Sequence, residues 1–99
     1  MREKEFERFL VKDNQIESKD KAVRSRVSKA RKIEVEFKVN LDDIVRDDER
    51  MYNTLKRIRR ELVDSNGSIQ NALRKYYAFV NQIAFPTLNQ YEKKHAHFE

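Results

Sequence analysis

The sequence has no cysteine, one glycine and one proline among its 99 residues. Without cysteine there is no disulfide and no thiolate metal site, so we expect a protein of the reducing cytoplasm. A β-sandwich needs a turn about every ten residues, and so few glycines and prolines argue against that fold. The same scarcity argues against a flexible linker or a low-complexity segment. Together these absences favour helices, which need few such breakers.

Long apolar runs and catalytic motifs are also missing. No run approaches the ~18 apolar residues of a spanning helix, and the first segment, MREKEFERFLVKD, is too charged for a signal peptide. There is no Gly-rich phosphate loop, no HExxH motif and no cysteine nucleophile. His95 and His97 stand in the terminal HAH, without the further ligands that complete a metal site. We therefore expect no membrane span, no cofactor, no small-molecule substrate and no enzymatic activity.

Charged residues are what the chain has in abundance. They make up 39% of the sequence against 38% hydrophobic residues, and the mean hydropathy is −0.96. A chain of this length forms one domain, with a lean core and a heavily charged surface. The net charge of +5 and the pI of about 9.6 favour a polyanionic partner. Many helical proteins carry this balance without such a partner, so charge alone leaves both interpretations open.

One stretch, residues 18–37, predicts an amphipathic helix with a cationic face. At 100° per residue, its apolar side chains fall within about a third of the helix circumference, opposite its cations. Ser18 is placed to cap this helix, and Asp20 lies in its first turn, where the helix dipole favours an acid. The apolar positions are Val23, Val27, Ala30, Ile33 and Phe37. The opposed cations are Lys21, Arg24, Lys29, Arg31 and Lys32.

Two further helices and a helical turn are predicted in the first two thirds of the chain. A helix covers residues 3 to about 12, and a single turn at residues 41–45 is expected to be capped by Asn40. The next helix begins near Asp47, with acids in its first turn and bases in its last, as the helix dipole prefers. The core stripe of this helix is Met51, Leu55, Ile58 and Leu62.

The segment DSNGS, residues 64–68, separates the last main helix from the others. Gly67 is suited to a left-handed backbone there, and Ser68 is suited to cap a helix from residue 69 to about residue 83. The predicted buried stripe of this helix is Ile69, Leu73, Tyr76, Val80 and Ile83, flanked by Ala72, Tyr77 and Phe79.

Two basic faces form the candidate nucleic-acid interface. Outward cations along a helix can contact backbone phosphates, and each contact releases counterions. Ser28 is a short donor beside the first face, Asn71 on the last main helix is suited to an adenine edge, and Arg74 and Lys75 are expected to face outward. The alternative is a solvated basic surface without a partner. The candidate residues are Lys21, Arg24, Ser28, Lys29, Arg31, Lys32, Asn71, Arg74 and Lys75.

The pattern of these helices resembles the N-terminal, SAM-like core-binding domain of phage integrases and other tyrosine recombinases. The chain departs from that family at Ala22 and Arg26, which stand where Thr and Tyr are typical. The resemblance covers roughly residues 6–81 and includes no catalytic signature. The similar segments are FERFL at 6–10, SRVSKARKI at 25–33, LDDI at 41–44 and NALRKYYAFV at 71–80.

The resemblance implies an orthogonal bundle that clamps duplex DNA, with the helices at residues 18–37 and 69–83 nearest the groove. We therefore predict an all-α, SAM-like single domain of four main helices plus a short C-terminal helix. Residues 1–85 form the bundle, and residues 86–99 form the short helix and a tail. The predicted function is DNA binding, either by a fragment that lacks its C-terminal catalytic domain or by a bundle that acts alone.

A protein-interaction module of a small phage or accessory protein is the alternative prediction. Its basis is a set of large apolar side chains near the C-terminus that a small bundle is expected to leave exposed. Such a surface would bind a protein partner or a second copy, without nucleic acid. The apolar side chains are Phe85, Leu88, Tyr91 and Phe98.

Overall fold

Six α-helices and no strand form the part of the chain that the computed structural model describes, residues 1–13, 19–64 and 66–95. The predicted all-α class is therefore confirmed. None of the helices in these ranges is both long and apolar enough to span a membrane. The helices are α1 (Glu3–Val11), α2 (Lys19–Phe37), α3 (Leu41–Val45), α4 (Asp48–Glu61), α5 (Ser68–Asn81) and α6 (Leu88–His95).

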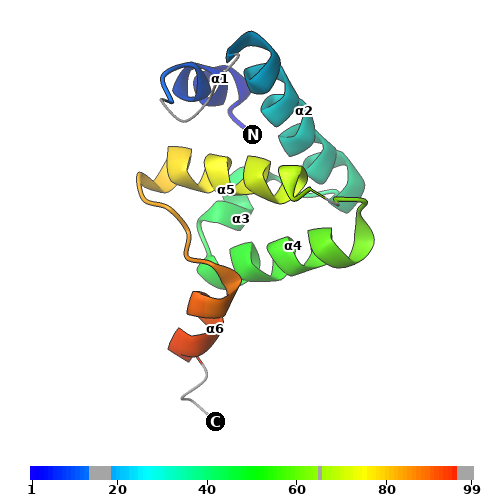
Figure 1. The fold of residues 1–99 in the computed structure, drawn as a ribbon, viewed down its shortest axis with the longest axis vertical. Coiled ribbons are helices and arrows are strands. Elements are labelled where there is room, and N and C mark those ends of the chain that lie inside the picture. Colours follow the sequence, from blue (N-terminus) through cyan, green and yellow to red (C-terminus); the bar gives the residue numbers. More distant parts are fainter. Residues whose placement is uncertain (14–18, 65, 96–99) are drawn as a thin grey trace.

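Helix α5 lies at the centre of the fold and packs against α1, α2, α3 and α4. In Figure 1 it crosses the view between α2 above and α4 below, and it runs antiparallel to α4. Helix α1 packs on α2, and the short α3 packs on both α4 and α5. Helix α6 extends away from the other helices beyond α4. The all-α class does not identify the bundle as SAM-like, so that arrangement stays a prediction.

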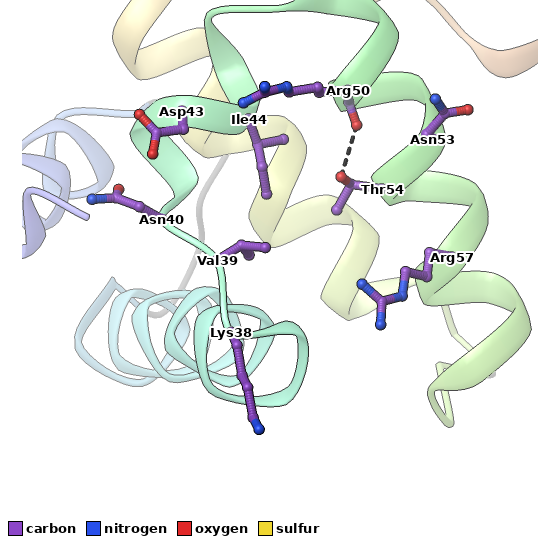
Figure 2. A pocket seen from close by; sticks show the side chains of 9 residues that line it. All are labelled: Lys38, Val39, Asn40, Asp43, Ile44, Arg50, Asn53, Thr54 and Arg57. Carbon is purple, nitrogen blue, oxygen red and sulfur yellow. Dashed lines mark hydrogen bonds between the residues drawn. The ribbon is translucent and has the colours of Figure 1, made fainter.

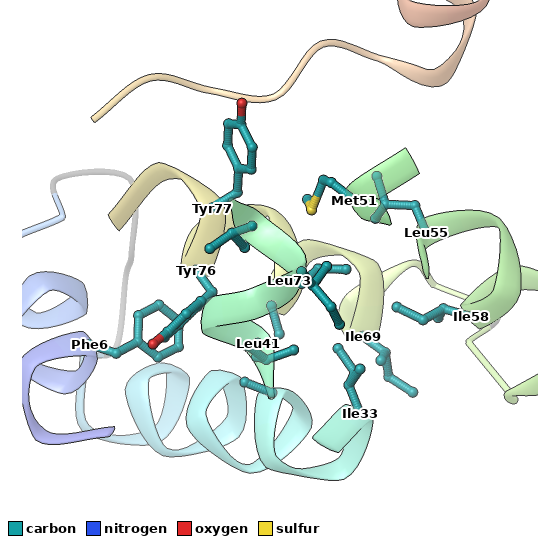
Figure 3. Close-up of a cluster of buried hydrophobic side chains, with 14 of the residues drawn as sticks. Phe6, Ile33, Leu41, Met51, Leu55, Ile58, Ile69, Leu73, Tyr76 and Tyr77 are labelled. Atoms are coloured by element: carbon teal, nitrogen blue, oxygen red, sulfur yellow. The ribbon is translucent and has the colours of Figure 1, made fainter. Parts of the chain in front are cut away.

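The core is built from apolar positions that helical spacing predicted. All five positions of the α2 stripe are buried. In α4, Met51, Leu55 and Ile58 are fully buried, and Figure 3 shows Leu55 and Ile58 directed toward the side chains of α2 and α5, among them Ile33. Leu62, expected in the same stripe, is only partly buried, because it is the C-cap residue and its backbone is already extended.

Helix α5 ends two residues earlier than predicted. Gln82 adopts a left-handed conformation with φ 60°, and the chain turns away there. Ile83 is therefore 65% exposed instead of buried, and Val80 is only partly buried. The core is closed in their place by Tyr77 and Phe85, whose rings meet edge to face with centroids 5.1 Å apart.

The apolar side chains after α5 are largely covered by the fold, which corrects the expectation that they stay exposed. Phe85 is buried, and Leu88 is partly buried against the core. The ring of Tyr91 stacks on Tyr52 of α4, with centroids 4.6 Å apart, and on Phe85 at 5.5 Å. Phe98 lies outside the described residues. Phe85, Leu88 and Tyr91 thus pack on the body of the protein and do not form an exposed apolar surface for a partner.

Helices α3 and α4 begin with polar caps. The side chain of Asn40 accepts a hydrogen bond from the backbone N–H of Asp42 at 2.9 Å, which confirms its predicted role as the N-cap of α3. Asp47 caps α4 in the same way, accepting from the N–H of Glu49. These bonds satisfy N–H groups that have no partner within the helix. Ser18, the predicted cap of α2, lies outside the described residues.

The cap of α5 differs from the prediction. Gly67 has φ 72°, as expected, but Ser68 is the first residue of the helix and caps nothing. The carboxylate of Asp64 takes that role, since it accepts hydrogen bonds from the N–H of Ile69 at 2.8 Å and of Gln70 at 3.0 Å. Burial disfavours the charged carboxylate, but these donors more than offset it and hold the pKa of Asp64 below its usual value.

We expect Asp64→Ala to lower the free energy of unfolding by about 1–2 kcal/mol, because it leaves two N–H groups at the start of the central helix without their acceptor. Ser68→Ala is the matched control and should change stability by less than about 0.5 kcal/mol. Urea denaturation followed by circular dichroism measures both. Equal losses from the two variants would contradict the assignment of Asp64 as the cap.

Candidate nucleic-acid interface

Between residues 21 and 33, the exposed face of α2 is a basic surface without an acid of its own. Residues 21–33 contain six Lys or Arg and no Asp or Glu. Lys21, Ser28 and Lys32 are exposed and fall within about 40° of one another around the helix. The helix rises 1.5 Å per residue, so Lys21 and Lys32 are ~16 Å apart along its axis, about five base-pair steps of duplex DNA.

Most of the cations on this face are not held by other parts of the protein. Lys21 and Lys32 make no ion pair with any described residue. Arg24 donates its Nε–H to the backbone carbonyl of Asp20 at 3.4 Å, and Lys29 donates to the hydroxyl of Ser25 at 2.5 Å. Neither contact is an ion pair, but the charge of Lys29 helps to lower the pKa of Asp64. Lys21, Arg24 and Lys32 keep their charge available to an anion, and Lys29 shares its charge with Asp64.

Arg31 is an exception among the predicted residues of α2. Its guanidinium forms an ion pair with Glu3 of α1, with Nη2 to Oε1 at 2.5 Å and Nε to Oε1 at 3.1 Å. Glu7 also lies with Glu3 beside Arg24 and Ser28, along the crevice between α1 and α2. The edge of the basic face next to α1 is therefore partly neutralised, and at the opposite edge Lys29 lies within electrostatic reach of Asp64.

Arg74 and Lys75 of α5 do not face solvent freely, which corrects their predicted placement. Arg74 donates through Nη1 to the backbone carbonyls of Phe85 at 3.1 Å and Pro86 at 3.0 Å, and burial lowers its pKa. Lys75 forms an ion pair with Asp13 at 2.5 Å, and both side chains are largely buried. The reason is that Asp13, just after α1, and the segment after α5 both lie against this side of the helix. Asn71 remains exposed, as expected.

Arg26 is a candidate that the sequence-based selection missed. At 100° per residue it falls between Ile33 and Phe37, inside the apolar arc of α2. Its Nε is buried and has no hydrogen-bond acceptor among the described residues. It lines a pocket of about 400 Å³ together with Arg74 and Lys75. A cation on the apolar side of an amphipathic helix is the signal that could have identified it.

A second pocket, of about 500 Å³, lies where the end of α2 meets α3 and α4 (Figure 2). Two of its three cations, Arg50 and Arg57, are balanced by nearby groups. Arg57 lies 4.0 Å from the centroid of the Phe37 ring and pairs with Glu61 at 3.0 Å, while Arg50 lies 3.9 Å from an Asp47 carboxylate oxygen. The basic crowding on α4 is thus largely paired within its own helix, and this pocket has no excess charge comparable to that of α2.

Metal ligands do not gather in the described ranges, where no group of three or more Asp, Glu and His side chains could hold an ion. Comparison with known proteins finds no match: no family model matches the chain, and neither does any curated protein or solved structure. The resemblance to the core-binding domain of tyrosine recombinases therefore stays a prediction.

Proposed function

We propose that this protein binds the phosphate backbone of duplex DNA through the exposed face of α2. The observation that carries the proposal is the run from Lys21 to Ile33, which presents cations along about three helical turns without an acid of its own. The recombinase-like helix pattern supports the same interpretation. Contacts of this kind position a protein on DNA, whereas base edges specify the sequence.

Four cations form the proposed contact set, because they lie outside the apolar arc of α2 and make no ion pair with a described carboxylate: Lys21, Arg24, Lys29 and Lys32. Ser28 lies between them and can donate its hydroxyl to a phosphate oxygen. Arg31 is left out of the set, because its ion pair with Glu3 joins α2 to α1. Arg74 is left out as well, because it holds the segment after α5.

A protein-interaction module has less support than DNA binding. Its basis was an exposed apolar surface near the C-terminus, and Phe85, Leu88 and Tyr91 are instead packed on α4 and α5. The exposed large hydrophobic side chains that remain, such as Val35 and Val63, lie on separate elements. Single exposed apolar residues are normal on soluble proteins and indicate no partner.

Binding should weaken steeply with salt. For about four phosphate contacts, the plot of log affinity against log salt concentration should have a slope of about −3.6, so affinity falls about 100-fold between 50 and 200 mM salt. Fluorescence anisotropy with a labelled duplex of about 20 base pairs measures the slope. Absence of binding at ~50 mM salt, or a slope near zero, would overturn the proposal.

A further inference from the structure

The pocket that Arg26 lines is a concentrated positive site on the other side of α2. It lies between α2, α5 and the segment that follows α5, and its volume of about 400 Å³ is within the range of small-molecule sites. Among the described residues, its polar lining consists of Arg26, Asn71, Arg74 and Lys75 and includes no carboxylate. Three positively charged side chains thus converge on one pocket from two helices.

The lining has hydrogen-bond donors that the protein leaves unused. The buried Nε of Arg26 has no acceptor among the described residues, and a buried donor without an acceptor costs about 1–3 kcal/mol. Arg74 uses only Nη1 for the carbonyls of Phe85 and Pro86, so its other N–H groups remain available within the described structure. An acceptor in this pocket would bind the unused N–H groups of Arg74 and would lie beside the guanidinium group of Arg26.

The charge of the pocket defines the anion that fits it. Lys75 is balanced by Asp13, which leaves about two positive charges that no described carboxylate compensates, those of Arg26 and Arg74. A phosphate monoester carries about −1.5 to −2 at neutral pH and three acceptor oxygens, which match two guanidinium forks. A carboxylate carries only one negative charge. A phosphodiester inside a strand carries one as well and is flanked by two sugars.

We propose that the pocket between α2 and α5 binds a phosphate monoester, the group found on a nucleotide and at the 5′ end of a nucleic acid strand. Arg26 and Arg74 hold the phosphate oxygens, and the amide of Asn71 at the rim donates a further hydrogen bond. Arg26 lies about 140° around α2 from Lys21, so this site is separate from the proposed duplex-binding face. It can be occupied whether or not that face binds DNA.

The first test titrates the protein with adenosine monophosphate, with inorganic phosphate and with adenosine, using isothermal calorimetry. The two phosphates should bind and adenosine should not. Arg26→Gln should weaken phosphate binding about 10- to 100-fold, since hydrogen bonds to charged groups contribute about 1.5–3 kcal/mol. Arg26→Lys should restore part of it, and Arg59→Gln, outside the pocket, should leave it unchanged. Phosphate binding that is undetectable, or equally strong in Arg26→Gln, would overturn the proposal.

A second variant protects the test against misfolding. Asn71 is exposed, so Asn71→Ala should keep the wild-type melting temperature. It should still weaken binding of adenosine monophosphate about threefold, because one hydrogen bond to the anion at an exposed rim is lost. If Arg26→Gln fails to fold, the test depends on Asn71→Ala and on competition by sulfate. An unchanged affinity of Asn71→Ala for adenosine monophosphate, together with complete displacement of that ligand by sulfate, would count against a phosphate-specific pocket. A reduced affinity would support it.

The third arm distinguishes the two sources of the phosphate and separates this proposal from duplex binding. A 5′-phosphorylated oligonucleotide duplex should bind more tightly than the 5′-hydroxyl duplex if strand ends are the natural ligand, and Arg26→Gln should remove only that difference. Equal binding of the two duplexes, with adenosine monophosphate still bound, assigns the pocket to free nucleotides and supports the monoester site. If the wild-type protein binds adenosine monophosphate but does not bind the 5′-hydroxyl duplex, the result contradicts the proposal for α2 and leaves the pocket proposal standing.

Discussion

Replacing Lys21, Ser28 and Lys32 together with Glu is expected to reduce duplex affinity at least about 100-fold at low salt. The three side chains lie on one exposed line of α2, so the change removes two phosphate contacts and places three carboxylates where the backbone would approach. Two charge reversals and one added acid take the formal net charge from +5 to 0. Anisotropy at ~50 mM salt measures the loss.

The fold should tolerate this variant. None of the three side chains has an ion-pair partner among the described residues, and all are exposed. Lys21 lies in the first turn of α2, where the helix dipole favours an acid. The melting temperature should therefore move by only a few degrees, about the effect of 0.5 kcal/mol or less. Unfolding of the variant would show that these residues stabilise the fold.

A charge-matched control separates the α2 face from net charge. Arg59→Glu, Asn89→Glu and Lys93→Glu together also bring the net charge to 0, but they lie on α4 and α6 and not on the exposed face of α2. The duplex affinity of this variant should stay within about threefold of the wild-type affinity at salt concentrations where Debye screening is effective. A loss as large as that of the α2 variant would assign the binding to general charge and contradict a defined interface.

Local sequence patterns predicted the parts of the fold that depend on near neighbours. The 3.6-residue spacing identified the buried side of α2, because burial on a single helix face depends on position around that helix. The left-handed Gly67 and the cap formed by Asn40 are also local, since each acts within two residues of its position. Asp64 was missed as the cap of α5 because its acceptor oxygens reach five and six residues along the chain.

Side-chain partners that come from distant segments could not be predicted. Lys75 is neutralised by Asp13, 62 residues away in sequence, and Arg31 by Glu3, 28 residues away. Helical spacing places these cations correctly on their helices but contains no information about which loop or helix will cover them. The candidate interface therefore became smaller once the structure was known. For Arg26, the angle on the helix can be read from the sequence, but its place in a pocket cannot, because the other lining residues come from α5 and the segment after it.

The largest loss of stability is expected from Tyr76→Ala, about 3–5 kcal/mol in urea denaturation. Tyr76 is fully buried at the centre of α5, and its ring meets Phe6 of α1 edge to face with centroids 5.0 Å apart. A domain of this size has a total stability of about 5–15 kcal/mol, so the variant should be partly or wholly unfolded. A loss below about 1 kcal/mol would contradict the central position of this ring.

Tyr76→Phe isolates the hydroxyl group, which joins three elements. It accepts a hydrogen bond from the backbone N–H of Arg2 at 2.8 Å and donates one to Asp42 Oδ1 at 2.6 Å. Removing it should cost about 1–3 kcal/mol, because both partners stay partly buried. Tyr77→Phe is the matched control: it removes a single bond, to Asp48, which lies in the exposed first turn of α4. It should cost about 0.5–1 kcal/mol.

The pH dependence of the Tyr76→Phe effect provides the independent check. Burial disfavours the charged form of Asp42, but the hydrogen bonds from Tyr76 and Arg2 more than offset it and lower its pKa. A lowered carboxylate pKa contributes stability above about pH 4 that is lost as the pH falls, so the cost of Tyr76→Phe should shrink in acid.

At high pH the phenol itself titrates. Burial, and to a smaller extent the hydrogen bond to Asp42, raises the pKa of Tyr76 to about 12. Because the folded state favours the protonated phenol, wild-type stability should fall between about pH 10 and 12, and this contribution should be absent from Tyr76→Phe. A cost that stays constant across the acid and alkaline ranges would show that the hydroxyl is not the bridge between α1, α3 and α5.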